Sequence, residues 1–309
     1  MDGSDSGAQA MGGRPWSVEG FVAGPLWRLD GRVGLVTGAS YGLGAFFAAV
    51  LAKAGADLIL TARSADKLAE TARRVETLGR RCLCIPADVT SYPECERVVN
   101  ASLATFESID ILVNNAGWAD DGLVRTEKVD PESFTKMVMT DLVGVFYMTR
   151  AVAPVMLRTG GGSIINMSSI FGDGGAENRT AGYFAAKGGV NNLTRLLACE
   201  WGDRNVRVNA LAPNFFLSEM TRRLLEDSGM AEWMRSRTPM RRLGELEELI
   251  GPLLFLASDA SSFVTGAVLP VDGGYGAARG YAQNPQPWDG WSEAGKPIQP
   301  ATKDRPRSR

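Results

Sequence analysis

The stretch VGLVTGASYGLGAFFAAVLA, residues 33–52, reads as a short apolar strand, a glycine-rich turn and an apolar helix. Gly38, Gly42 and Gly44 lie between the strand and the helix, where the backbone must turn tightly. Glycines there also let the chain approach a pyrophosphate, which the N–H groups at the helix N-terminus stabilise. The stretch therefore predicts a nucleotide-binding loop, with contacts from Gly38, Ser40, Tyr41, Gly42, Leu43 and Gly44.

Beyond this stretch, short apolar runs alternate with helical stretches of ten or more residues. The later runs are 57–62, 81–87, 109–117, 163–169, 206–212 and 267–273. Such alternation is typical of βαβ units in a parallel sheet. We therefore predict an α/β fold, a single doubly wound Rossmann-type domain over residues 29–276, with seven parallel strands and helices on both faces. Two of the expected helices cover residues 131–157 and 245–258.

The two ends of the chain differ from this domain in composition. Residues 1–28 are rich in Gly, Ser and Ala without a period, and we expect a flexible leader. Residues 277–309 contain five prolines, and Trp288 and Trp291 within PWDGW. Because exposed indole rings forgo burial, we expect this C-terminal arm to pack on protein, and more readily on a neighbouring subunit, near its residues 215–242, than on its own core. A disordered end is the alternative.

The composition narrows the class of protein. Lys and Arg number 33 and Asp and Glu 35, so nothing indicates nucleic-acid binding. There is no signal peptide, and no apolar stretch approaches the length of a membrane helix, which predicts a cytoplasmic protein away from membranes. The chain has no histidine and no CxxC pair, so we expect no metal site. We interpret its cysteines as core thiols: Cys82, Cys84, Cys95 and Cys199.

The end of the second strand bears on the choice of dinucleotide. A carboxylate there would bind the ribose 2′-hydroxyl of NAD, whereas an arginine suits the 2′-phosphate of NADP. The sequence is TARS, with Arg63 and no acid before Asp66, which favours NADP(H). Ligands bind at the carboxyl ends of strands in such sheets. Further contacts are thus expected after the third and fourth strands, from Asp88, Val89, Asn115, Ala116 and Gly117.

Without histidine, proton chemistry near neutral pH needs another group. Tyr183 and Lys187 stand four residues apart in YFAAK, on one face of an expected helix. A phenol in water has a pKa of about 10, and a neighbouring ammonium group favours the phenolate. Tyr183 is therefore the candidate proton donor and acceptor, with Lys187 beside it.

The motifs TGASYGLG, NNAG, Ser169, YFAAK and VNALAP occur in an order and spacing that resemble the short-chain dehydrogenase/reductase family over residues 30–276. The resemblance implies that Ser169, Tyr183 and Lys187 are catalytic and that Lys187 also binds the nicotinamide ribose. Ser169 is preferred over Ser168 because the family has a glycine three residues after the catalytic serine, here Gly172. It also implies a homotetramer or homodimer and further cofactor contacts from Pro213, Asn214, Phe216 and Ser218.

Two residues depart from the family pattern. The family usually has asparagine in NLxG, where this chain has Asp141 in DLVG. If the main-chain carbonyl holds the family's water, Asp141 serves as well; if the carboxylate faces Lys187, it partly offsets the effect of the ammonium on Tyr183. Asn214 replaces the glycine after Pro213, and asparagine tolerates a positive φ better than most residues. Its side chain is expected near the nicotinamide.

Bulky apolar residues surround the expected substrate position, among them Trp118, Phe171, Phe215 and Trp233. They favour a carbonyl reductase that interconverts a ketone and a secondary alcohol on a bulky or apolar small molecule, similar to the 3-oxoacyl reductases of the family. Two alternatives stay open: a sugar-acid or polyol dehydrogenase of the same family, and a nucleotide-sensing protein without turnover.

Overall fold

The computed structural model describes residues 24–118, 124–175, 181–216 and 228–278. Most of the predicted leader and C-terminal arm, with Trp288 and Trp291, lies outside these ranges. Within the predicted leader, Pro25–Trp27 form a 3-10 helix, η1, and Trp27 packs against Phe255 with ring centroids 6.3 Å apart. The packing of the domain thus includes residues before the predicted boundary at 29.

A parallel sheet forms the centre of the described structure. Its seven strands have the order β3-β2-β1-β4-β5-β6-β7, which confirms the predicted α/β fold. The strands are β1 (Val33–Thr37), β2 (Asp57–Thr61), β3 (Cys82–Cys84), β4 (Ile111–Asn114), β5 (Gly162–Met167), β6 (Val206–Pro213) and β7 (Val268–Val271). The strand order reverses between β1 and β4, and ligands bind at the carboxyl ends of such a switch point.

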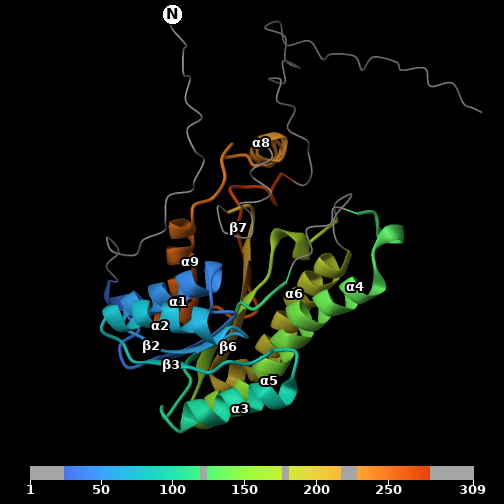
Figure 1. The fold of residues 1–309 in the computed structure, drawn as a ribbon. Helices are drawn as coiled ribbons and strands as arrows, with labels where there is room; N and C mark the ends of the chain where they lie inside the picture. Colours follow the sequence, from blue (N-terminus) through green and yellow to red (C-terminus); the bar gives the residue numbers. More distant parts are fainter. Residues whose placement is uncertain (1–23, 119–123, 176–180, 217–227, 279–309) are drawn as a thin grey trace, which may run out of the picture.

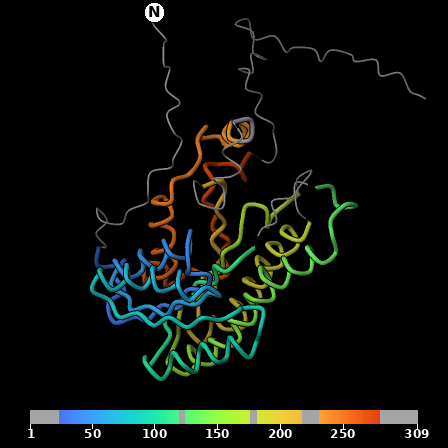
Figure 2. The backbone as a smooth tube through the Cα atoms, viewed as in Figure 1, coloured from blue at the N-terminus to red at the C-terminus, as the bar shows by residue number. Residues whose placement is uncertain are grey.

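Successive side chains of a strand enter two apolar cores on opposite faces of the sheet. Val36 packs in the core under α1 (Gly42–Ala54), α2 (Ala65–Thr77) and α9 (Ile250–Ala257). Leu35 packs in the other core, under α3 (Tyr92–Leu103), α5 (Gly144–Thr159) and α6 (Ala181–Trp201). The two groups of helices lie on either side of the strands in Figure 1. Figure 2 shows the orange α9 beside the blue α1, so the late part of the chain covers the first helix.

A long helix carries one wall of the site. It consists of α4 (Pro131–Val138), a π-helical turn η3 (Met139–Val143) and α5. Asp130 begins α4 by accepting the N–H of Ser133, and Gly160, in the left-handed region, ends α5. By length and composition alone, one described helix could cross a membrane: Pro131–Thr159 has 29 residues, and its most apolar 18-residue window has a mean hydropathy of 1.2. Half of that apolar window is buried inside the domain, as in a core helix.

The remaining described elements are short. They are η2 (Thr126–Lys128), η4 (Ile170–Gly172), η5 (Gly202–Arg204), α8 (Ser228–Arg237), η6 (Leu246–Leu249) and η7 (Asp259–Ser261). The helix expected over 245–258 is thus divided into η6 and α9. Cys82 and Cys84 pack partly against the α1 core and Cys95 is buried, but Cys199 is exposed. The interpretation as a core thiol is wrong for Cys199, because it lies on the outer face of α6.

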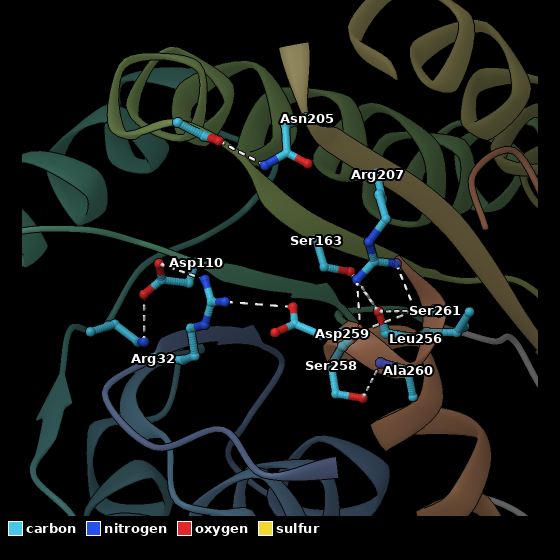
Figure 3. A network of polar contacts seen from close by, with 12 residues as sticks. Arg32, Asp110, Ser163, Asn205, Arg207, Leu256, Ser258, Asp259, Ala260 and Ser261 are labelled. Carbon is cyan, nitrogen blue, oxygen red and sulfur yellow. Dashed lines mark hydrogen bonds and ion pairs between the residues drawn. The ribbon is translucent and has the colours of Figure 1, made fainter. Parts of the chain in front are cut away.

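A cluster of polar groups covers the amino ends of β5 and β6, away from the carboxyl ends of the strands (Figure 3). The Arg207 guanidinium donates to the Ser261 hydroxyl at 2.7 Å and to the carbonyls of Leu256 and Ser258 at 3.0 and 3.1 Å. Ser163 also donates to the Leu256 carbonyl, at 2.7 Å. Arg207 therefore satisfies carbonyl groups at the end of α9 and fixes that helix to β6, while burial lowers its pKa from the usual arginine value.

Candidate active site

The glycine-rich turn after β1 leaves no room for side chains at two positions. A Cβ on Gly44 would lie 2.2 Å from the Gly38 carbonyl oxygen, and one on Gly38 would lie 2.8 Å from Cα of Ala116. Gly38 and Gly42 also have φ values of +64° and +58°. The first turn of α1 therefore opens directly onto a cleft, which the whole predicted loop lines: Gly38, Ser40, Tyr41, Gly42, Leu43 and Gly44.

The cleft has a volume of about 720 Å³ and runs along the carboxyl ends of the strands. At one end lie Arg63 and Lys67, and Lys67 Nζ stands 5.0 Å from the centre of the Tyr41 ring. The sequence analysis missed Lys67, which lies in the first turn of α2, four residues after Arg63. Asp88 and Val89 line the wall beyond, as expected, and Asp88 accepts two hydrogen bonds from Thr90.

The loop after β4 lies against the glycine-rich turn. The Thr37 hydroxyl accepts the N–H groups of Asn115 and Ala116 at 3.0 and 2.9 Å, and Asn115 Nδ2 donates to the Thr37 carbonyl. Asn115, Ala116 and Gly117 all line the cleft. These bonds fix the two loops to one another, and both loops line the same cleft.

Asp141 and Lys187 form a buried ion pair, with 3.2 Å between Oδ2 and Nζ. The other carboxylate oxygen accepts the N–H of Trp118 at 2.6 Å, and Lys187 Nζ donates to the Met167 carbonyl at 2.9 Å. Burial alone would lower the pKa of Lys187, but the Asp141 carboxylate and the nearby Tyr183 hold it above its usual value. Of the two arrangements left open by the sequence, the carboxylate therefore faces Lys187.

Tyr183 and Lys187 lie on one face of α6, as their spacing predicts. Lys187 Nζ is 5.4 Å from the centre of the Tyr183 ring, and both residues line the cleft together with Asp141. The half-buried phenol thus lies within the electric field of an ammonium group that is itself held in place by two protein groups, the Asp141 carboxylate and the Met167 carbonyl.

The two serines after β5 have different partners. Ser168 donates to the Oδ1 of Asn191, a buried residue of α6 that the sequence analysis did not single out. Ser169 accepts the N–H of Phe171 at 3.2 Å, so its own hydroxyl proton can be donated elsewhere. Both serines line the cleft. The contrast favours Ser169 as the serine that contacts a ligand.

The predicted substrate residues are only partly brought together. Trp118, Phe171 and Phe215 line the cleft, and the rings of Phe171 and Phe215 lie 6.0 Å apart. Trp233 does not line it; its ring packs 6.1 Å from that of Phe215, and the next residue of α8, Met234, lines the cleft instead. In the described structure Met234 thus lines the cleft at this turn of α8, and a substrate contact by Trp233 stays a prediction.

The comparisons with known proteins agree with this geometry. Residues 38–276 match the family model described as enoyl-(acyl carrier protein) reductase. The chain is 39% identical to a gluconate 5-dehydrogenase of Gluconobacter oxydans over 81% of this chain and 96% of that one. It is 38% identical to a 3-oxoacyl-[acyl-carrier-protein] reductase of Thermotoga maritima, over 80% of this chain and 98% of that one.

A solved structure has the same fold. The gluconate 5-dehydrogenase of Burkholderia cenocepacia, in complex with NADP and tartrate, is 36% identical, covers 82% of this chain and 98% of its own, and has a TM-score of 0.78. The chain belongs to the short-chain dehydrogenase/reductase family. Members of this family are oxidoreductases, so this chain is an oxidoreductase by family.

The carboxyl end of β6 is followed by Asn214, the second residue that departs from the family pattern. Pro213, Asn214 and Phe216 line the cleft, while Ser218 lies outside the described residues. Asn214 is not among the described non-glycine residues with a positive φ; its backbone N–H donates to the Val271 carbonyl and its Nδ2 to the Asp272 carbonyl. Its Oδ1 is buried and accepts no hydrogen bond within the described structure.

Proposed function

We propose that this chain is an NADP(H)-dependent carbonyl reductase that interconverts a ketone and a secondary alcohol. The observation that carries the proposal is the convergence of Ser169, Tyr183 and Lys187 on the cleft that the glycine-rich loop also lines. The glycine loop and the start of α1 fit the phosphates of a dinucleotide. The family membership makes an oxidoreductase the expected activity.

The proposed chemistry uses three side chains in distinct roles. When bound, NADPH supplies the hydride that is added to the carbonyl carbon. Ser169 donates a hydrogen bond to the carbonyl oxygen, and Tyr183 gives its phenolic proton to the same oxygen. Lys187 stabilises the phenolate that remains, which then takes up a proton from solvent. The products are the secondary alcohol, NADP⁺ and the regenerated phenol, and oxidation runs the same steps in reverse.

The preference for NADP(H) is supported by charge at one end of the cleft. Arg63 and Lys67 line it there, and no acid follows β2 before Asp66. Two cations suit a 2′-phosphate, which NAD lacks. The solved gluconate 5-dehydrogenase with bound NADP supports the same preference.

The substrate class is supported less directly. The aromatic lining from Phe171, Phe184 and Phe215 favours an apolar ketone. The gluconate 5-dehydrogenases among the relatives favour a sugar acid, which is the second candidate. A polyol needs several hydrogen-bonding groups, and the described aromatic wall offers few.

A substrate panel tests the proposal. The purified protein is incubated with NADPH and, separately, with cyclic ketones, a 3-oxoacyl thioester and 5-ketogluconate, and the absorbance of the reduced nicotinamide is followed. We expect oxidation of NADPH with at least one apolar ketone, and loss of turnover with retained NADPH binding in Tyr183→Phe. Binding of NADPH without turnover of any ketone or alcohol would instead support the nucleotide-sensing alternative.

A further inference from the structure

A lysine lies at the substrate end of the cleft and has no assigned role. Lys136, on α4, lines the cleft, and its Nζ lies 4.2 Å from the centre of the Trp118 ring. It stands five residues before Asp141, which corresponds to about 7.5 Å along a helix at a rise of 1.5 Å per residue. The ring contact holds the ammonium over one aromatic face and leaves donors for another partner.

The packing of α4 shows which end of the cleft this is. Gly182, next to Tyr183, approaches α4 so closely that a Cβ on it would lie 3.2 Å from the Met137 Cβ and from the Phe134 carbonyl oxygen. The turn of α4 that carries Lys136 is therefore packed against the turn of α6 that carries Tyr183. Arg63 and Lys67, by contrast, line the cleft beside β2 and α2.

The charge of Lys136 is not neutralised by the described residues. Asp141, the acid that lines the same wall, is already bonded to Lys187 and to the Trp118 N–H. Glu132, four residues earlier on α4, is exposed and is not among the ion pairs of the described structure. A cation that has no carboxylate partner among the described residues, and that lies near the proposed proton donor, suits an anionic group of the substrate.

Apolar side chains also line this part of the cleft, beside the polar Thr140 and Ser169. They are Met139, Phe171, Phe184, Phe215 and Met234. The rings of Phe171 and Phe184 lie 5.1 Å apart and form one continuous wall. A ligand that buries a hydrocarbon group against this wall removes that group from water, while an acid group on the same ligand meets the Lys136 ammonium.

From the position of the Lys136 ammonium beside this aromatic wall we infer that the substrate is a ketone with an apolar body and a carboxylate. In this inference Lys136 binds the carboxylate. The inference rests on the proposed function and narrows it. It distinguishes an amphiphilic oxo acid both from a neutral apolar ketone, which needs no cation, and from a polyhydroxylated sugar acid, which gains little from the aromatic wall.

Matched substrates test the role of the charge. We compare 4-oxocyclohexanecarboxylate with its neutral methyl ester, which keeps the ring and the ketone. We expect a KM for the acid at least tenfold lower than for the ester. Lys136→Met should raise the KM for the acid about tenfold with little change in kcat, and should leave the ester and NADPH unaffected. Lys136→Arg should keep the preference for the acid. Lys128→Met, which removes an exposed lysine of η2 outside the cleft, is the control.

A binding measurement separates this inference from the proposed function. Cyclohexanecarboxylate and cyclohexanecarboxamide lack the ketone, so calorimetric titration in the presence of NADPH reports binding without turnover. If the acid binds more tightly than the amide and this difference depends on Lys136, the inference is supported. It is supported even if no ketone is reduced, because a lack of reduction counts only against the proposed reductase activity. Equal KM values for acid and ester, or equal binding of acid and amide in the wild type and in Lys136→Met, would overturn it.

Discussion

The Asp141 carboxylate lies 3.2 Å from the Lys187 ammonium, and both groups are buried next to Tyr183. An asparagine, which the family resemblance leads us to expect at position 141, is neutral, whereas this chain has a negative charge near Tyr183. If Lys187 stabilises a Tyr183 phenolate, as proposed, the carboxylate opposes that effect by attracting the same ammonium. The pair also ties the loop after β4 to α6 through the Trp118 N–H.

Replacement of Asp141 by asparagine should change the pH dependence of alcohol oxidation. Oxidation needs the phenolate of Tyr183 as base, and loss of the neighbouring carboxylate favours that phenolate. We expect the acidic limb of the rate profile with NADP⁺ to move to lower pH. Asp173→Asn, which removes an exposed carboxylate, is the control for overall charge. An acidic limb at the same pH in Asp141→Asn and wild type would show that the carboxylate does not oppose the phenolate.

The same pair predicts how stability depends on alkaline pH. The pKa of Lys187 in the folded protein is raised, because the attraction of Asp141 and Tyr183 exceeds the effect of burial. A raised pKa contributes stability that is complete below the unfolded lysine value of about 10.4 and is lost as pH rises through the folded value. Urea unfolding between pH 8 and pH 11 should therefore show a fall in the free energy of unfolding above about pH 10. The fall should be smaller in Asp141→Asn; an equal fall in both proteins would assign it to other groups.

Arg63 and Lys67 should distinguish the two dinucleotides. Because NADPH alone carries the 2′-phosphate, Arg63→Ala and Lys67→Ala should each raise the KM for NADPH by about tenfold and leave that for NADH nearly unchanged. Arg73→Ala, an exposed position of α2 outside the cleft, should affect neither. Equal losses for NADPH and NADH would mean that these cations do not bind the 2′-phosphate.

Arg207 should matter for stability and not for chemistry. Arg207→Met removes the hydrogen bonds to Ser261, Leu256 and Ser258 and leaves carbonyl groups at the end of α9 without their donor. At about 1 kcal/mol for each bond, the free energy of unfolding should fall by about 2–3 kcal/mol, with KM values unchanged. Arg204→Met, which removes a guanidinium bonded to one exposed carbonyl, serves for comparison. A loss no larger than that of Arg204→Met would contradict the role assigned to the cluster.

Local patterns in the sequence were sufficient for the fold and for most of the cleft. The glycine positions and the spacing of Tyr183 and Lys187 are local features, and a parallel sheet brings the carboxyl ends of its strands together. The orientation of Trp233 and Met234 depends on how α8 packs, which no single-helix pattern contains. The partner of the Asp141 carboxylate was left open for a related reason, since a π-helical turn decides where it points. No local pattern singles out Lys67 and Lys136, because the Tyr41 and Trp118 rings that they contact come from other segments. The oligomeric state and the position of the C-terminal arm stay predictions.

The π-helical turn at Met139–Val143 accommodates one residue more than an α-helical turn would. Loss of a single residue there would return the turn to α-helical geometry, and α4 and α5 would keep nearly their present relative orientation because the wide turn absorbs the extra residue. Lys136 would then stay on the cleft side of α4, while the side chains of the turn itself, Asp141 among them, would change direction. A one-residue deletion in this turn is thus a way to move the carboxylate away from Lys187 without disturbing the helices on either side.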